Sequence, residues 1–286
     1  MHLLLSGAAK NSRERKMPNF FHIVVCAGIA PDPLQTLEPA TGPNGPGIKN
    51  EMLLPAVLDP WAASALYEAA HLAASCAGSK VWLVSLGPKA KLQQLMMTVA
   101  QKASFELIAI DGPIGGFTDA HATASVLAGA ISAIAGLDKT KLLLFGGWES
   151  ATRGAGVALQ LTGELLGIAD QFQGVDRVEM SDDGSFEVLE RVEGGKHLAS
   201  NCGGAPAVLG WATGNLPEPR NNPQVGMANM RTMMPALQKA KTAALDPNGL
   251  RYISVSLPSR QRSTRVVKDL NPDEIARELV EWIGAE

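Results

Sequence analysis

The sequence predicts a three-layer α/β/α fold built on a mostly parallel, Rossmann-like sheet. Apolar, β-branched runs without polar alternation recur along the chain, which is typical of parallel strands buried on both faces. Helix-like stretches separate these runs, as the crossovers between parallel strands require. With 286 residues, 46% of them apolar, the chain can bury one large core.

Four strand-like runs alternate with helix-like stretches from residue 21 onward. The expected strands are Phe21–Ala27, Lys80–Gly87, Phe105–Asp111 and Lys141–Gly147. The expected helices are residues 61–75, 89–103, 119–136 and 157–167. Thr118 and Asp119 are typical N-cap residues, and we expect them to begin the third helix.

Two segments interrupt this alternation. The Pro- and Gly-rich stretch Pro31–Pro46 lies inside the first crossover, and we expect a loop there that covers the sheet edge or a ligand. Residues 177–197 predict a β-hairpin excursion with Asp183 and Gly184 at its turn.

The C-terminal segment Pro258–Ile283 is the most informative part of the chain. It contains a basic, proline-punctuated segment, a short strand at Val266 and Val267, and a terminal amphipathic helix. Such an extension after a complete α/β pattern indicates an arm for another subunit. We expect an N-terminal extension at 1–20, with Met17 as an alternative start, an α/β domain at 21–241 and a C-terminal arm at 242–286.

Composition excludes several classes of protein. The net charge of -3 and the scattered basic residues disfavour nucleic-acid binding. Three cysteines lie far apart with no CxxC pair, which favours a reducing cytoplasm. No apolar run approaches the roughly 20 residues that span a bilayer, and the N-terminus lacks a secretory pattern. We therefore expect a soluble, cytoplasmic protein without membrane insertion.

The usual catalytic constellations are missing from the sequence. The five histidines show no metal-ligand spacing, and no GxSxG, Walker A or GxGxxG motif is present. The remaining candidate is Gly146–Gly156, a glycine-rich turn between a buried strand and a helix. Its backbone N–H groups and the helix N-terminus can bind a phosphate, and Arg153 can pair with one. A tight turn without a ligand explains the same residues.

Several segments, in the same order, resemble the beta subunit of electron transfer flavoproteins, and the resemblance covers residues 22–283. They are IVVCAGIAPDP, VLDPWAASALYEAAHL, SLGPKAKLQQLMMTVAQKA, DAHATASVLAGAI, LERVEGGKHLA, APAVLGW and QRSTRVV. The resemblance implies the adenine-nucleotide-binding type of this fold, in a divergent member of the family.

The resemblance implies an electron carrier without catalytic residues of its own. Such a subunit pairs with an alpha subunit that holds most of the redox FAD. The pair carries electrons from flavin dehydrogenases to a quinone reductase or another acceptor. The beta subunit itself holds AMP, or a second FAD in electron-bifurcating members. The chemistry then belongs to the cofactor, which the polypeptide positions and tunes.

The resemblance also implies which residues contact the cofactors. Three segments before the glycine-rich loop contribute Cys26, Ala27, Asp59, Ser85, Leu86 and Gly87. The loop contributes Gly146, Gly147, Thr152, Arg153, Gly154, Gly156 and Val157. Trp61 falls where the family has an aromatic residue against the partner's FAD, although a Trp half-buried at a helix start explains it equally well.

The loop departs from the family pattern. Ala151, Arg153, Gly156 and Val157 stand where the family has side chains that contact phosphate or ribose. Backbone donors and Arg153 can compensate, and the glycines leave room for a bulkier ligand. A loop that has lost its nucleotide is equally consistent with these residues.

Three residues are candidates for partner contacts. Met234 takes the position of a family leucine that anchors partner dehydrogenases, although a core role in a helix is the alternative. Arg262 and Arg265 are candidates for the interface with the alpha subunit, against a role as solvated charges. The alternative function is a nucleotide-binding or structural α/β protein that has lost electron transfer.

Overall fold

The computed structural model describes residues 20–42, 45–113, 118–152, 156–214, 216–245, 264 and 266–284. The chain divides into two units, Met1–Tyr252 and Ile253–Glu286, and each is described by itself. The predicted domain boundaries at 20/21 and 241/242 stay predictions.

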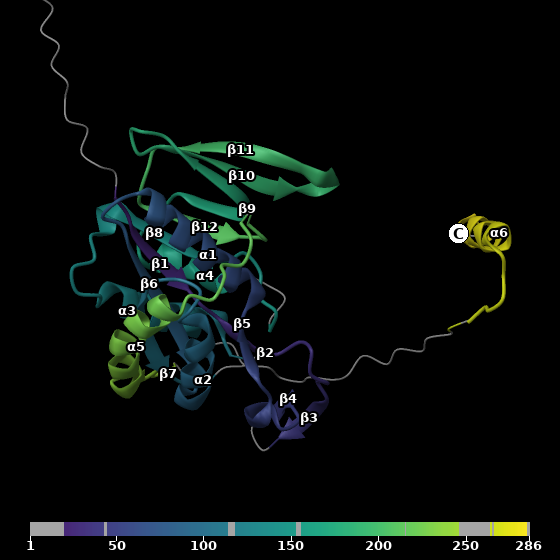
Figure 1. Ribbon diagram of the computed structural model, residues 1–286, viewed down its shortest axis with the longest axis horizontal. Coiled ribbons are helices and arrows are strands. Elements are labelled where there is room, and N and C mark those ends of the chain that lie inside the picture. Colours follow the sequence, from purple (N-terminus) through teal and green to yellow (C-terminus); the bar gives the residue numbers. More distant parts are fainter. Residues whose placement is uncertain are drawn as a thin grey trace, which may run out of the picture. The chain divides into compact units, whose positions relative to one another are not determined.

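A nine-stranded sheet forms the middle layer of the first unit. Its strands are β1 (His22–Cys26), β6 (Lys80–Gly87), β7 (Glu106–Asp111), β8 (Leu142–Gly147), β9 (Gln171–Met180), β10 (Phe186–Val192), β11 (Lys196–Cys202), β12 (Ala207–Trp211) and β13 (Lys241–Thr242). The order is β11-β10-β9-β12-β8-β1-β6-β7-β13 (Figure 1). Only β10 runs antiparallel to its neighbours, β9 and β11. The mostly parallel sheet confirms the predicted fold class.

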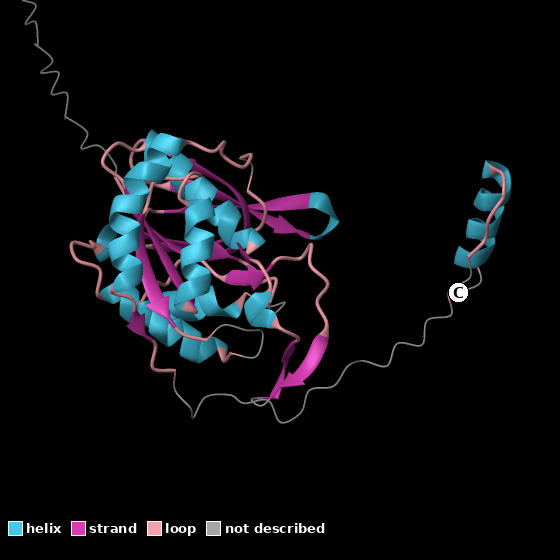
Figure 2. Cartoon of the chain, turned by 60° about the horizontal axis from the view of Figure 1, so that its bottom comes forward, coloured by secondary structure: helices cyan, strands magenta, loops and turns pink. Residues whose placement is uncertain are grey.

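Helices cover both faces of the sheet (Figure 2). They are α1 (Pro60–Ser75), α2 (Lys89–Val99), α3 (Ala120–Ser132), α4 (Val157–Leu165) and α5 (Pro223–Gln238). α1, α2 and α5 pack on one face, and α3 and α4 on the other. Because both faces are covered, β1 is buried along its whole length, which is why its sequence is continuously apolar after His22. Asp119 caps α3 as predicted and accepts a bond from the Ala122 amide at 2.8 Å.

The structure corrects two expectations and adds a strand that was not predicted. Pro31–Pro46 is more than a loop, because Ile29–Pro31 (β2) pairs with Ala56–Leu58 (β5), and Pro39–Gly42 (β3) pairs with Gly45–Ile48 (β4). β12 was not predicted, although it lies between β8 and β9. Val266 and Val267 form no strand within the described residues and are exposed, because neither has a strand partner there.

Short 3-10 helices lie at Glu51–Leu53, Lys139–Lys141 and Glu193–Gly195.

The predicted hairpin is present and is fixed by a buried carboxylate. Its turn joins β9 to β10, with Gly184 in the left-handed region at φ 91°. Asp176 on β9 accepts two bonds from the Arg191 guanidinium, at 2.8 and 3.0 Å, and lies 2.9 Å from His197 Nε2. Burial alone would raise the pKa of Asp176, but the Arg191 and His197 contacts outweigh it and hold the pKa below its usual value.

This carboxylate predicts a pH dependence of stability. Because its pKa is lower in the folded chain, ionised Asp176 stabilises the fold above pH 3.8, and that contribution is lost as the pH falls through the folded pKa. We expect Asp176→Asn to lower the free energy of unfolding at pH 7 and to flatten its decline in acid. Denaturant unfolding between pH 3 and 7 measures this. Exposed Glu193→Gln on the same hairpin is the matched control, and equal pH profiles for Asp176→Asn and wild type would contradict the role.

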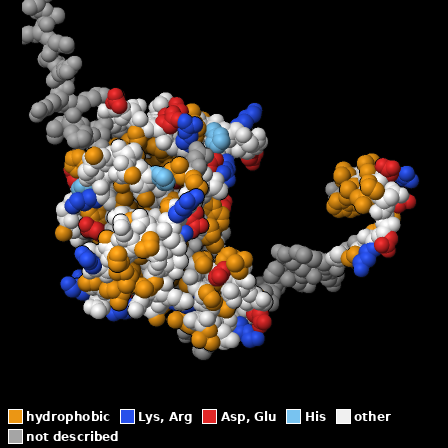
Figure 3. All heavy atoms as spheres, in the orientation of Figure 1, with side chains coloured by type: hydrophobic (Ala, Val, Ile, Leu, Met, Phe, Trp, Pro, Cys, Tyr) orange, Lys and Arg blue, Asp and Glu red, His pale blue; other side chains and the backbone are white. Residues whose placement is uncertain are grey.

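The second unit contains one described helix, α6 (Pro272–Ile283). Asn271 and Glu274 form a capping box at its start. Apolar side chains gather on the helix and stay exposed (Figure 3). They include Ile275, Leu279, Val280, Trp282 and Ile283. The predicted amphipathic helix is therefore confirmed, whereas its role as an arm stays a prediction.

Candidate functional site

A cavity of about 120 Å³ lies at the carboxyl ends of the central parallel strands. It is lined by the ends of β1, β6 and β8, by the residue before α1, by α3, and by the loop that leads from β8 into α4. Open α/β sheets place ligands at this edge, because the crossover loops there surround a crevice. The location makes this cavity the candidate ligand site.

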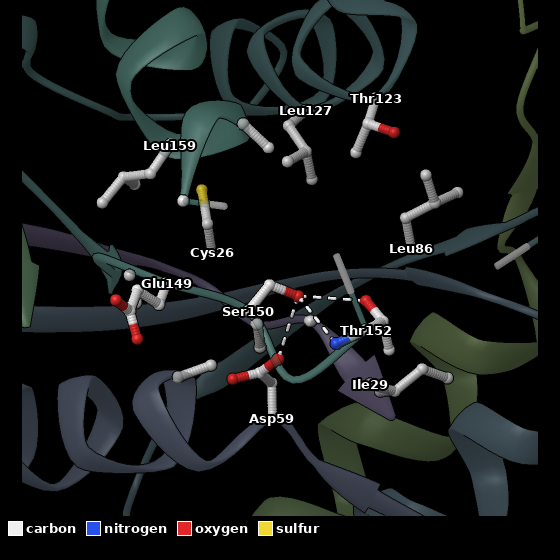
Figure 4. A pocket seen from close by; sticks show the side chains of 17 residues that line it. Cys26, Ile29, Asp59, Leu86, Thr123, Leu127, Glu149, Ser150, Thr152 and Leu159 are labelled. Carbon is white, nitrogen blue, oxygen red and sulfur yellow. Dashed lines mark hydrogen bonds between the residues drawn. The ribbon is translucent and has the colours of Figure 1, made fainter. Parts of the chain in front are cut away.

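One half of the cavity is apolar. Figure 4 shows Cys26, Leu86, Leu127 and Leu159 on the side away from Asp59. Burial raises the pKa of the Cys26 thiol to about 12, so the thiol stays neutral and acts as a small apolar group. Such walls suit a flat, weakly polar ring.

The other half is polar and is organised around Asp59 (Figure 4). Asp59 is 4% exposed, and its Oδ2 accepts bonds from the Ala151 amide at 2.8 Å and from Ser150 Oγ at 3.2 Å. Its Oδ1 accepts the Trp61 amide at 3.2 Å and so caps α1. Ser150 Oγ also lies 3.0 Å from Thr152 Oγ1. The carboxylate thereby joins the start of α1 to the loop after β8.

Burial raises the pKa of Asp59, and the bonds from Ala151, Trp61 and Ser150 partly oppose this effect. Each of these three groups donates to the carboxyl oxygens. The surroundings therefore accommodate the ionised form, which accepts without donating.

Glycines allow the close approach of the elements around the cavity. A Cβ at Gly146 would lie 2.9 Å from Leu159 Cδ1, and one at Gly147 would lie 2.6 Å from Trp61 Cβ. A Cβ at Gly156 would overlap the carbonyl group of Trp148, so the loop returns to its own first residue before α4 begins. The glycine-rich sequence is thus required by packing alone, whether or not a ligand binds.

Eight of the predicted cofactor-binding residues line this cavity. They are Cys26, Ala27, Asp59, Leu86, Gly146, Gly147, Thr152 and Gly156. Four others do not line it. Ser85 is buried and donates to the Ala27 carbonyl at 2.8 Å, Gly87 lies at the end of β6, Trp61 is half-buried in α1, and Val157 is exposed at the start of α4. Arg153 and Gly154 lie outside the described residues.

Several lining residues were not predicted. They are Gly28, Ile29, Ala62, Thr123, Leu127, Glu149, Ser150, Ala158 and Leu159. Thr123 and Leu127 lie four residues apart on α3, a spacing that marks one helix face without showing what that face lines. Glu149 and Ser150 belong to the predicted glycine-rich turn Gly146–Gly156. Their polar side chains are the sequence feature that could have identified them as site residues.

The predicted partner contacts fall outside this cavity. Met234 in α5 is half-buried and packs against the core, next to fully buried Met233. The anchor role of Met234 stays a prediction. Arg262 and Arg265 lie outside the described residues.

Across the described part of the chain, no cluster of histidine, cysteine or acidic residues could hold a metal ion. None of the helices described there is long and apolar enough to cross a bilayer.

The cavity fits only part of an adenine nucleotide. Its apolar half suits the base, and the carboxylate in its polar half suits hydroxyl donors such as those of a ribose. Asp59 and Glu149 are the acidic residues that line the cavity, and its described lining residues include no Lys, Arg or His. The volume is also below the roughly 300 Å³ of ordinary ligand pockets.

A family model described as electron transfer flavoprotein domain matches residues 51–245, which is more than half of the chain. No curated protein matches the chain. The matched range includes Asp59, the loop after β8 and the hairpin.

Proposed function

Because the chain belongs to the electron transfer flavoprotein domain family, we propose that it is the beta-type subunit of a heterodimeric electron carrier. Proteins of this family are electron carriers rather than classical enzymes. In the proposed complex an alpha subunit holds most of the redox FAD. The complex takes electrons from flavin dehydrogenases and passes them to a quinone reductase or another acceptor. The polypeptide then has no reaction of its own to catalyse.

The observation that carries this proposal is the convergence of the family's nucleotide segments on one cavity. The ends of β1 and β6, Asp59, and the loop after β8 are far apart in sequence, yet they line the same space. We infer that this cavity holds an adenine-containing ligand, for which the resemblance gives AMP or a second FAD as candidates. The bound group would have its base against Leu86, Leu127 and Leu159.

The remaining parts of the proposal concern the partner. Trp61 is half-buried at the start of α1, where it can meet a flavin held by another chain. The apolar side chains of α6 are the proposed contact with the alpha subunit, with residues 242–286 as the arm. A heterodimer of this kind would work in the cytoplasm, without membrane insertion.

One observation favours the alternative function. In the loop after β8, the Ala151 amide and Ser150 Oγ donate to Asp59, so these two groups are not free to bind a phosphate. A chain that kept the α/β domain while losing the flavin partner would look the same. The alternative is therefore a nucleotide-binding or structural protein.

Co-expression with an alpha-type partner separates these two functions. We expect the two chains to co-purify as a yellow complex that releases one FAD per heterodimer when denatured, together with any adenine-containing ligand of this chain. Leu279→Asp in α6 should reduce co-purification at least tenfold, because it places a charge on the exposed apolar face. Leu53→Asp is the control, since Leu53 is 83% exposed outside the arm. A colourless monomer in the presence of the partner would favour the alternative function.

A further inference from the structure

A cleft of about 910 Å³ lies between the second half of α1 and the end of β9. One wall comes from residues between 68 and 77, and the other from residues between 178 and 182. Phe145 of β8 and Trp211 of β12 also line this space, which we call the α1–β9 cleft. Its described lining residues do not overlap with those of the candidate ligand site. Its volume lies within the roughly 300 to 1,000 Å³ of ordinary binding sites.

The interior of the α1–β9 cleft is apolar. Leu72, Val178 and Met180 are half-buried in its walls and pack against the core. Phe145 and Trp211 are almost fully buried. Because the half-buried side chains keep part of their apolar surface exposed, a ligand with aliphatic groups would remove that surface from water, which favours binding. The cleft therefore suits aliphatic groups.

Trp211 adds a hydrogen-bond donor to the cleft lining. The side chain is 2% exposed, and its indole Nε1 has no partner among the described residues. Buried donors in folded proteins nearly always meet an acceptor. A peptide segment carries backbone carbonyl groups, which are such acceptors. The unpaired donor therefore favours a peptide over a purely aliphatic ligand.

The charged groups of the cleft are acidic on both walls. Glu68 belongs to α1, and Asp182 belongs to the turn after β9. Glu68 Oε1 accepts the Leu216 amide at 3.3 Å, which holds this carboxylate in place. His71 follows Glu68 by three residues and shares its helix face. Two carboxylates on facing walls attract a cationic group and repel an anionic one.

We propose that the α1–β9 cleft is a docking site for a segment of another protein chain, in which aliphatic side chains stand next to lysine or arginine. The aliphatic side chains cover the half-buried walls, and the basic side chain lies beside Glu68 and Asp182. Main-chain carbonyl groups of the segment supply acceptors for the buried indole. The inference goes beyond the proposed function and does not depend on it, because the cleft is separate from the candidate ligand site.

Calorimetric titration of the full chain with three acetylated, amidated peptides tests the proposal at low ionic strength. The peptides have the sequences LLKSLR, LLQSLQ and LLESLE, so they differ only in charge. We expect LLKSLR to bind at least tenfold more tightly than LLESLE, with LLQSLQ between them. Asp182→Lys should reduce this preference to less than threefold, because it places a cation at the cleft. Leu72→Ala should weaken binding of all three peptides at least threefold, because it removes apolar surface from one wall.

Glu193→Lys is the matched control for charge. It makes the same change at an exposed position of the same hairpin, away from the cleft lining, and should keep the tenfold preference. Circular dichroism checks that each variant is folded. Equal affinity of wild type for the three peptides, no binding of any of them, or an unchanged preference in Asp182→Lys would overturn the proposal. Sedimentation without peptide covers the other occupant: a dimer that Asp182→Lys dissociates would assign the cleft to a second copy of this chain and overturn the proposal as well.

Discussion

Replacing Trp211 by alanine is expected to lower the free energy of unfolding by about 3 to 5 kcal/mol, the usual cost of deleting a buried tryptophan side chain. Trp211 is only 2% exposed at the end of β12. Its ring lies 5.3 Å from that of Phe145 at an interplanar angle of 59°. β12 lies between β8 and β9. The empty space left by the deleted ring would therefore weaken the packing between the parallel strands and the hairpin. Denaturant unfolding followed by circular dichroism measures the loss.

Two variants test whether burial is the cause. Trp282→Ala removes the same side chain from α6, where it is 71% exposed, and should change the stability of the isolated chain by less than about 0.5 kcal/mol. Trp211→Phe should cost less than Trp211→Ala. It keeps a ring against Phe145, and it deletes an indole Nε1 that is buried and has no partner among the described residues. Equal losses for Trp211→Ala and Trp282→Ala would contradict the assignment of Trp211 to the core.

The sequence predicts the parallel part of the fold well, because strands that are buried on both faces consist mostly of apolar residues. β1, β6, β7 and β8 are continuous apolar runs, and only that composition is stable between two layers of helices. The hairpin is also predictable, because the Asp183-Gly184 turn is a local signal. β12 is also an apolar run, but a short one. It has five residues that include Gly210, and its place between β8 and β9 depends on long-range pairing.

The site residues at the ends of neighbouring strands are predictable from the sequence. Those that reach the cavity through the packing of a helix, or through a long-range hydrogen bond, are not. Cys26 and Gly146 end neighbouring strands, so their proximity follows from the parallel sheet. Thr123 and Leu127 look like ordinary residues of an amphipathic helix, and only the packing of α3 brings them to the cavity. The bond between Asp59 and Ala151 joins residues 92 positions apart, which no local pattern encodes.

The role of Asp59 changes the interpretation of the loop after β8. Its departures from the family pattern look like the loss of a nucleotide site when the loop is considered alone. With Asp59 included, the Ala151 amide and Ser150 Oγ have an acceptor within the chain, which stabilises this buried polar region. Ser150 and Ala151 are therefore positioned by an internal carboxylate.

Replacing Gly156 by alanine should have the second large effect, because the loop closes on itself at this residue. The new Cβ would overlap the Trp148 carbonyl group, and the obstacle is backbone rather than a flexible side chain. The chain must then move at both ends of the loop, which we expect to cost about 3 kcal/mol of unfolding free energy. The movement would also shift Ser150 and Ala151 away from Asp59, so binding of the proposed adenine-containing ligand should fall at least tenfold.

Gly129→Ala supplies the matched comparison. Gly129 lies exposed in α3, and a Cβ there meets no atom within 4 Å. Alanine is the better helix former, so this variant should gain up to about 1 kcal/mol and bind the adenine-containing ligand as wild type does. If Gly156→Ala matched wild type in both stability and binding, the loop could not be held as tightly as the contact with Trp148 requires. Loss of binding without loss of stability would instead mean that the loop moves freely while the cavity depends on its position.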